Sequence, residues 1–261
     1  MDITKSPWSY TAIVNRLRAA GCVFAEDEAD LLISAGRTPA DLAAMIESRV
    51  AGSPLEHVIG WAEFCGLRIA VDSGVFVPRH RTEFLVRQAA DLARSRTIVV
   101  DMCCGSGALG VALVAALDWS ELHAVDIDPA AVRCARRNVA GVGGHVYEGD
   151  LFEPLPARLQ GRVDILIANT PYVPTESIKL LPQEARIHEA RAALDGGADG
   201  LDIQRRVASA APLWLAPGGH LLVETSERQA PHTVEIFARN GLIARAARCD
   251  ELDATVVIGT K

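Results

Sequence analysis

Residues 97–117, TIVVDMCCGSGALGVALVAAL, decide the fold of this chain. The first seven of them are mostly apolar or β-branched, which predicts a buried strand. Residues 108–117 continue with small and branched apolar side chains and predict a helix. Gly105 and Gly107 lie between the two, where they let the backbone turn tightly and approach a ligand. The stretch therefore predicts a strand, a tight loop and a helix, the unit from which parallel sheets are built.

The alternation of apolar strands and helical segments continues towards the C-terminus. We expect strands over 121–127, 145–150, 162–169 and 219–226, helices over 129–140, 201–215 and 229–242, and closing strands over 243–250 and 254–260. This order implies an α/β fold with a doubly wound, mostly parallel sheet. Ligands of such sheets bind beyond the carboxyl ends of the strands, so the residues that follow each strand are the ones to inspect.

The chain before residue 81 has a different character. Apolar residues at helical spacing predict helices over 10–20 and 26–35, and Thr38-Pro39 caps a third helix that reaches Val50. Residues 53–80 then combine β-branched and aromatic side chains with three turn glycines, which is typical of hairpins. We expect an N-terminal helical bundle at 1–52, a β-hairpin linker at 53–80 and an α/β domain at 81–261.

Composition and charge narrow the class of protein. The 261 residues are 49% hydrophobic and 23% charged, as in an ordinary globular protein, and the net charge of −7 favours neither nucleic acid nor an anionic membrane as a partner. Six cysteines without metal-ligand spacing predict free thiols, and neither a metal site nor a disulfide framework. With no signal-peptide core or membrane-length apolar run in the sequence, we expect a cytoplasmic protein.

Two strand ends favour an adenosine-containing ligand. The pattern Gly105-x-Gly107-x-x-Gly110 alone fits a dinucleotide site, a methyl-donor site or a purely structural turn. About twenty residues later, Asp126 ends the next predicted strand, where a carboxylate can accept hydrogen bonds from both hydroxyls of a ribose. Asp128 precedes a proline and is better placed to cap the following helix.

Two further strand ends extend this site. Asp150 could accept a hydrogen bond from an adenine amine while Leu151 or Phe152 packs on the ring, although a surface turn fits equally well. Residues 169–172, Asn-Thr-Pro-Tyr, separate a methyl donor from a dinucleotide, because a dehydrogenase does not need them. An asparagine carbonyl and a rigid backbone carbonyl can accept both hydrogens of a planar NH2 group, and a tyrosine ring can stack on its plane.

The residues at these positions resemble the HemK-type protein-glutamine methyltransferases. The resemblance runs from about Pro54 to the C-terminus and rests on the segments PLEHVIGWAEFCGLRIAVDSGVFVPRHRTEFLV, DMCCGSGALGVAL, AVDIDPAAVRCARRN, GDLFEPL, NTPYVP, HEARAALDGGADGLDIQRRV and LAPGGHLLVE. It implies a seven-stranded, Rossmann-like class I methyltransferase domain and methylation of a glutamine side chain, above all in peptide-chain release factors.

The resemblance also implies which residues form the site. S-adenosylmethionine would be the donor, bound by Phe76, Arg79, Thr82, Asp101, Cys103, Cys104, Gly105, Ser106, Gly107, Asp126, Ile127, Asp150, Leu151 and Asn169. Pro78 and Glu83 would also line the entrance. The catalytic residues would be Asn169, Thr170, Pro171 and Tyr172: Asn169 orients donor and glutamine, the Thr170 carbonyl takes the second amide hydrogen, and Tyr172 stacks.

Three positions depart from the family pattern and point to a divergent branch. Thr170 replaces the first proline of the usual Asn-Pro-Pro-Tyr, which removes stiffness and keeps the carbonyl acceptor. Cys103 replaces a glycine and narrows the approach of the cofactor. Arg81 stands where an acidic residue is common, so the charge near the entrance is reversed.

Three other functions remain open on the sequence alone. The first is an amino methyltransferase that acts on a nucleic-acid base, which uses a similar Asn-Pro-Tyr turn, or on another amide or amine. The second is a nicotinamide-dependent oxidoreductase that uses the glycine loop. The third is a binding module that keeps the cofactor pocket without catalysis. The oligomeric state is undetermined.

Overall fold

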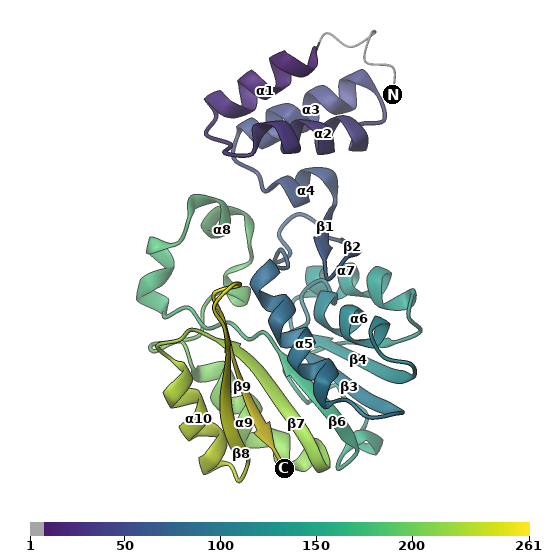
Figure 1. Ribbon diagram of the computed structural model, residues 1–261, viewed down its shortest axis with the longest axis vertical. Coiled ribbons are helices and arrows are strands. Elements are labelled where there is room, and N and C mark those ends of the chain that lie inside the picture. The colour runs from purple at the N-terminus through teal and green to yellow at the C-terminus, as the bar shows by residue number, and fades with distance from the viewer. Residues whose placement is uncertain (1–7) are drawn as a thin grey trace.

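The computed structural model describes residues 8–261 and shows a seven-stranded sheet in that part of the chain (Figure 1). The spatial order is β5-β4-β3-β6-β7-β9-β8. In chain order the strands are β3 (Thr97–Met102), β4 (Ser120–Asp126), β5 (His145–Glu148), β6 (Val163–Ala168), β7 (Leu215–Thr225), β8 (Ile243–Cys249) and β9 (Ala254–Thr260). The predicted α/β architecture with a doubly wound sheet is confirmed.

Strand direction separates the body of the sheet from its C-terminal edge. The pairs β3–β4, β3–β6, β4–β5 and β6–β7 are parallel, whereas β9 runs antiparallel to both β7 and β8. The parallel strands therefore bring their carboxyl ends to one edge of the sheet, as expected for a ligand site.

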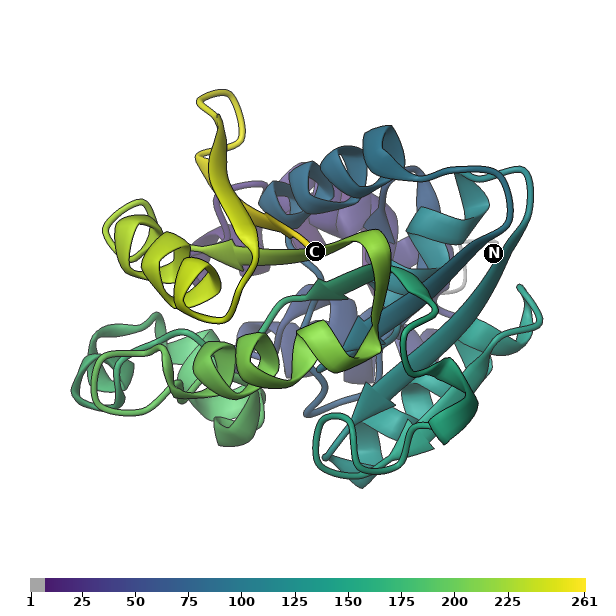
Figure 2. The ribbon, with the colours of Figure 1, turned by 90° about the horizontal axis from the view of Figure 1, so that it is seen from below.

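Helices cover both faces of the sheet (Figure 2). The helices α5 (Glu83–Leu92), α6 (Ala108–Ala115) and α7 (Pro129–Ala140) pack on one face, and α9 (Asp202–Trp214) and α10 (Ala230–Arg239) pack on the other. Successive strand residues point to opposite faces, so Val99 joins the first core and Val100 the second. Burial on both faces explains why these strands are almost continuously apolar.

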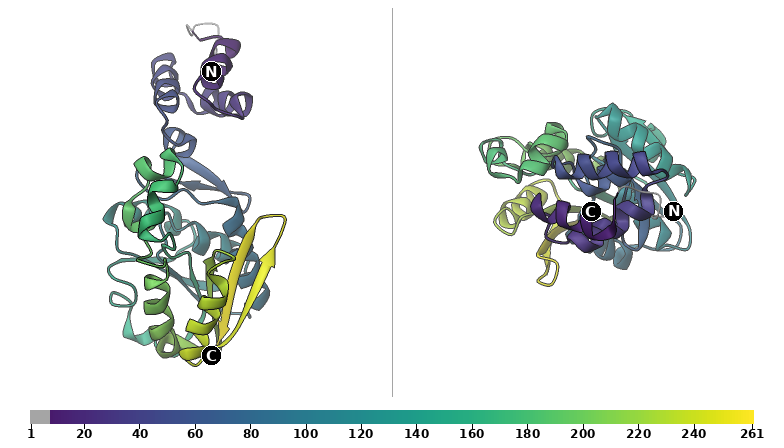
Figure 3. Two further views of the ribbon diagram at one scale, coloured as in Figure 1. Left: turned by 90° about the vertical axis from the view of Figure 1, so that its left-hand side faces the viewer. Right: turned by 90° about the horizontal axis from the view of Figure 1, so that it is seen from above.

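The N-terminal helices form a core of their own above the sheet (Figure 3). They are α1 (Tyr10–Ala19), α2 (Ala25–Ala35) and α3 (Pro39–Val50), close to the expected ranges. Thr38 caps α3 with its side chain, because its hydroxyl oxygen accepts from the Asp41 N–H at 3.1 Å. The division at 52/53 and 80/81 stays a proposal, and residues 1–7 of its first unit lie outside the described residues.

The linker contains less strand than expected. Residues 55–59 form a short helix, α4 (Leu55–Ile59), and a single hairpin follows, β1 (Trp61–Phe64) with β2 (Leu67–Ala70). Gly66 lies in its turn with φ +73°, whereas Gly74 forms an isolated bridge with Glu189. The structure therefore contains the expected hairpin, at residues 61–70, and the rest of the 53–80 segment adds a short helix and irregular backbone.

Two helical segments were not foreseen. Helix α5 buries Phe84, Leu85, Val86 and Ala89 on one face, a helical spacing that the sequence does contain. Between β6 and α9 the chain forms η4 (Thr175–Leu180), α8 (Gln183–His188) and η5 (Arg191–Ala193), and η3 (Ala157–Leu159) and η2 (His80–Thr82) are further short turns. No helix within residues 8–261 is long and apolar enough to cross a membrane.

Gly110 lets α6 approach the sheet. A Cβ at this position would lie 2.7 Å from Leu122 Cδ1 and 3.0 Å from Asp101 Oδ2. The Asp101 carboxylate occupies this space because Oδ2 accepts from the Gly110 N–H at 2.8 Å. The third glycine of the motif is therefore required for packing between strand and helix.

We expect Gly110→Ala to lower the free energy of unfolding by about 1–3 kcal/mol, because the added methyl overpacks the contact between helix and sheet. Gly141→Ala is the matched control: its backbone has φ −64°, and the nearest atom to an added Cβ is Asn138 O at 3.5 Å. Denaturant unfolding of both variants measures the difference. Equal stabilities would contradict the packing role of Gly110.

Asp101 makes stability depend on pH. Burial raises the pKa of Asp101 to about 8, while the unfolded chain releases this proton near pH 4. Unfolding between these values releases a proton, so the stabilisation present at low pH is lost as pH rises towards 8. In Asp101→Asn we expect the melting temperature to fall less between pH 5 and 8 than in the parent protein. Parallel curves would refute this assignment.

Candidate active site

A cavity of about 600 Å³ lies at the carboxyl ends of β3, β4, β5 and β6, a size typical of small-molecule sites. Its lining includes nearly all residues that the sequence singled out: Phe76, Arg79, Thr82, Cys103, Cys104, Gly105, Ser106, Asp126, Ile127, Asp150, Leu151, Asn169, Thr170, Pro171 and Tyr172. Pro78 lines it too. Pro54 and several residues between 181 and 195, among them Glu184 and Glu189, also contribute to the wall.

Two residues that were predicted to bind the cofactor do not line the cavity, but they support the 103–107 loop. Asp101 is not among the residues that line the cavity, and its Oδ2 accepts from the Gly110 N–H, while its Oδ1 is buried without a partner among residues 8–261. Its contact with the cofactor stays a prediction. Gly107 starts α6 with φ +77°, and a Cβ there would lie 3.1 Å from Val139 Cγ2. Both residues shape the turn between β3 and α6.

The 103–107 loop is tied to the end of β4. The Gly105 N–H donates to Asp126 Oδ2 at 2.8 Å, and the Asp128 N–H donates to Asp126 Oδ1 at 2.9 Å. Each oxygen keeps a second acceptor position, as a ribose diol requires. Burial raises the pKa of Asp126, and these backbone donors oppose that shift by stabilising the carboxylate. Loop and carboxylate therefore fit a nucleoside.

Cys103 follows β3 directly and begins the 103–107 loop. Its backbone has φ +58°, a left-handed conformation that glycine adopts without steric cost. Burial raises the pKa of the Cys103 and Cys104 thiols well above the ordinary value, so both are neutral side chains beside the cavity.

Asn138 joins the 103–107 loop to the hairpin. Its Nδ2 donates to Ser106 O at 2.8 Å and to Ala70 O at 2.9 Å, and its Oδ1 accepts from the Ala70 N–H at 2.9 Å. One side chain of α7 thus holds the end of β2 against the loop.

Asp150, which was predicted to contact the adenine, forms an ion pair with another residue of the protein. Asp150 Oδ2 forms an ion pair with Arg206 Nη2 at 2.7 Å, and Arg206 also lines the cavity. Leu151 follows in a left-handed conformation with φ +49°. The sequence does not reveal Arg206, because it lies on α9, 56 residues further along the chain.

The 169–172 segment contains buried hydrogen-bond acceptors that form no hydrogen bond with the described residues. Asn169 Oδ1 and Thr170 Oγ1 are buried and, within residues 8–261, have no hydrogen-bond partner. Buried polar atoms without a partner are rare and costly, so such atoms at a cavity wall indicate a ligand. Pro171 and Tyr172 follow on the same wall.

Tyr172 is fixed by two charged side chains. Its hydroxyl accepts from Arg81 Nη2 at 2.7 Å and donates to Glu224 Oε1 at 3.3 Å. Arg81 Nε also pairs with Glu224 Oε1 at 3.2 Å. Burial and the nearby Glu224 carboxylate together raise the pKa of Tyr172 to about 12, so the phenol stays protonated at neutral pH. Arg81 therefore compensates the buried charge of Glu224, which sequence reasoning missed.

Glu189 is a second missed residue. Its side chain is 1% exposed, forms an ion pair with Arg79 and accepts from the Val77 N–H at 3.4 Å. Its segment was noted in the sequence, but nothing there distinguishes Glu189 from the three aspartates of the same segment. Within the described chain, no group of histidine, cysteine and acidic residues could hold a metal ion.

Comparisons with known proteins agree with this geometry. The family model "Methyltransferase small domain" matches residues 66–200. The release factor glutamine methyltransferase of Geobacter sulfurreducens is 41% identical over 208 residues, 78% of this chain and 72% of that protein. A 4-amino-L-phenylalanine/4-methylamino-L-phenylalanine methyltransferase of Streptomyces pristinaespiralis is 32% identical over 88% of this chain and 80% of that protein.

Solved structures support the fold. A crystal structure of a methyltransferase from Pyrococcus furiosus matches with a TM-score of 0.56 at 17% identity, covering 75% of this chain and 89% of that one. This likeness supports a class I methyltransferase fold and carries nothing about substrate. Together with the sequence relatives and the cavity geometry, it shows that the chain is an S-adenosylmethionine-dependent methyltransferase and belongs to the release factor glutamine methyltransferase family.

Proposed function

We propose that the protein methylates the side-chain amide nitrogen of a glutamine in a peptide-chain release factor. The observation that carries this proposal is the buried Asn169 Oδ1, which lines the cavity and has no hydrogen-bond partner among residues 8–261. A primary amide offers two hydrogens in one plane, and an acceptor of this kind can hold one of them. The relatives named for release factors support the choice of substrate.

The residues of the site would act mainly by positioning. Asn169 Oδ1 accepts one amide hydrogen, the Thr170 carbonyl accepts the other, and the Tyr172 ring stacks on the amide plane. When bound, S-adenosylmethionine would supply an electrophilic methyl group, whose bond to sulfur breaks as the bond to the amide nitrogen forms. Two acceptors direct the nitrogen lone pair into the cavity, and the amide proton is lost once the new bond has formed.

The partner and location follow from the proposed substrate. A release factor takes part in translation, which places the enzyme in the cytoplasm. The net charge of −7 supports a protein partner over direct binding to nucleic acid. A second candidate is an aromatic amine such as that of 4-aminophenylalanine, because the same acceptors suit any planar NH2 group and one relative carries that name.

We expect Asn169→Ala to reduce methyl transfer to a purified bacterial release factor by about a hundredfold while cofactor binding stays measurable, because alignment of the amide is lost. Mass spectrometry of the substrate and calorimetry with S-adenosylmethionine provide the readouts. Asn240→Ala, an asparagine on α10 that bonds Ile236 O, is the matched control. Methylation of 4-aminophenylalanine in place of the release factor would favour the second candidate.

Arg81 and Glu224 should act as a pair. We expect Arg81→Met to lower the free energy of unfolding by about 1–3 kcal/mol, because it leaves a buried carboxylate without its cation, an effect moderated by the 47% exposure of the Arg81 side chain. In the Glu224→Gln background the loss should be smaller. A double-mutant cycle by denaturant unfolding measures this coupling, and strictly additive losses would argue against it.

A further inference from the structure

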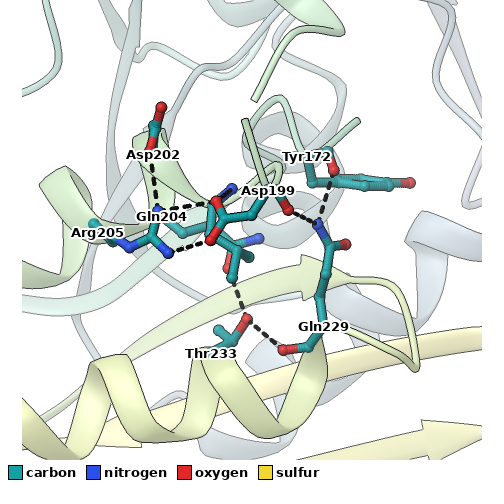
Figure 4. A network of polar contacts seen from close by, with 8 residues as sticks. Tyr172, Asp199, Asp202, Gln204, Arg205, Gln229 and Thr233 are labelled. Carbon is teal, nitrogen blue, oxygen red and sulfur yellow. Dashed lines mark hydrogen bonds and ion pairs between the residues drawn. The ribbon is translucent and has the colours of Figure 1, made fainter. Parts of the chain in front are cut away.

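Gln229 is the residue before α10, and its side chain contacts the backbone of the loop formed by residues 169–174. Its Nε2 donates to Tyr172 O at 3.0 Å and to Asp199 O at 3.0 Å (Figure 4). Its Oε1 accepts from Ser226 Oγ at 2.6 Å. Since Oε1 is occupied by a hydroxyl donor, the amide nitrogen is the atom that faces the two carbonyls.

The two carbonyls belong to backbone segments that lie side by side. The Val173 N–H donates to Leu194 O at 3.0 Å, the Gly196 N–H to Val173 O at 2.9 Å and the Thr175 N–H to Gly197 O at 2.9 Å. A Cβ on Gly200 would collide with Tyr172 O. The glycines of the 194–201 turn therefore permit a close approach, and Gln229 joins the two segments where they meet.

A second set of hydrogen bonds in the same region does not involve the 169–174 loop. Thr233 Oγ1 donates to Gln204 Oε1 at 2.8 Å, and both residues are fully buried (Figure 4). Thr233 Oγ1 also lies 3.3 Å from Gln229 O, but this carbonyl accepts from the Thr233 N–H at 3.0 Å as well, and Thr233→Val keeps that bond. This bond joins α10 to α9. It contributes to stability in the same region and offers a control that separates stability from positioning.

We propose that Gln229 is a positioning residue for methyl transfer, acting through the Tyr172 carbonyl on the direction of the Thr170 carbonyl and on the Tyr172 ring. This inference rests on the proposed function. Tyr172 is held at its hydroxyl by Arg81 and Glu224 and at its backbone by Gln229.

The residue type at position 170 makes this contact important. A proline at this position would restrict the backbone by its own ring, whereas threonine leaves more conformations accessible. The backbone conformation at this position must then be restricted by contacts with residues outside the loop. The two hydrogen bonds of Gln229 supply it for the residues that would align the substrate.

The test compares Gln229→Met and Gln229→Glu with Thr233→Val. Methionine has a similar length without donors, and glutamate has the same shape but presents acceptors to two carbonyls. Hydrogen exchange of the substrate-free protein reports on the Val173 and Thr175 amides, which donate to the 194–201 turn. We expect about tenfold faster exchange at these amides in both Gln229 variants and unchanged exchange there in Thr233→Val.

Kinetics add a second readout. With a release factor as substrate, kcat should fall about tenfold in Gln229→Met while KM changes less than roughly threefold, because alignment matters most in the transition state. Thr233→Val should keep kcat although it melts at a lower temperature. If parent and Gln229→Met exchange alike, or if Thr233→Val loosens the same amides equally, the inference is wrong.

The two proposals fail in different ways. If the unaltered enzyme transfers no methyl group to any release factor, the proposed substrate is wrong, and the exchange experiment still decides whether Gln229 holds the loop. If the loop loosens but kcat of Gln229→Met stays within twofold of the parent value, the positioning role is refuted.

Discussion

The hydrogen bond from the Gly105 N–H to Asp126 Oδ2 connects the turn after β3 to the end of β4, and the site is built on this connection. It forms only if the chain turns within a few residues and α6 starts close to the sheet. The left-handed backbone at Cys103, Gly105 and Gly107 provides the turn, and the missing side chain at Gly110 provides the close approach. The carboxylate that faces a ribose is thus oriented by the same loop that lies against the nucleoside.

Around the cavity, acidic side chains are paired with arginines from distant parts of the chain. Arg79 pairs with Glu189, Arg81 with Glu224 and Arg206 with Asp150. Glu189 and Glu224 are almost fully shielded from water, so an uncompensated charge there would be costly, whereas Asp150 and Arg206 remain partly exposed. These pairs join the linker region, β7 and α9 across the site. Arg81 therefore adds an internal contact that holds Tyr172.

The sheet could be predicted because its strands are long, apolar and separated by turn residues, as in 97–117 and 162–169. Helix α4 has only five residues, too short for periodicity to appear, and α5 follows Pro78 and the polar residues 79–82, which obscured its start. The strand ends predicted Asp126 and Asn169, since their place in the chain fixes their place in space. Their partners could not be predicted in this way. Arg206, Glu224 and Gln229 reach the site only through tertiary packing, and Asp101 faces Gly110 because the close approach of α6 leaves its carboxylate no nearer donor.

Asn138 bonds both to Ala70 at the end of the hairpin and to Ser106 in the 103–107 loop. The hairpin is therefore part of the floor on which the cofactor loop rests, although the sequence assigns it to a linker. A fragment cut at residue 81 would retain every residue of the sheet but lose the backbone that Asn138 holds. The smallest part of this chain that could be transferred as a working catalytic domain therefore begins before the α/β domain. A fusion protein or domain exchange would have to include the hairpin.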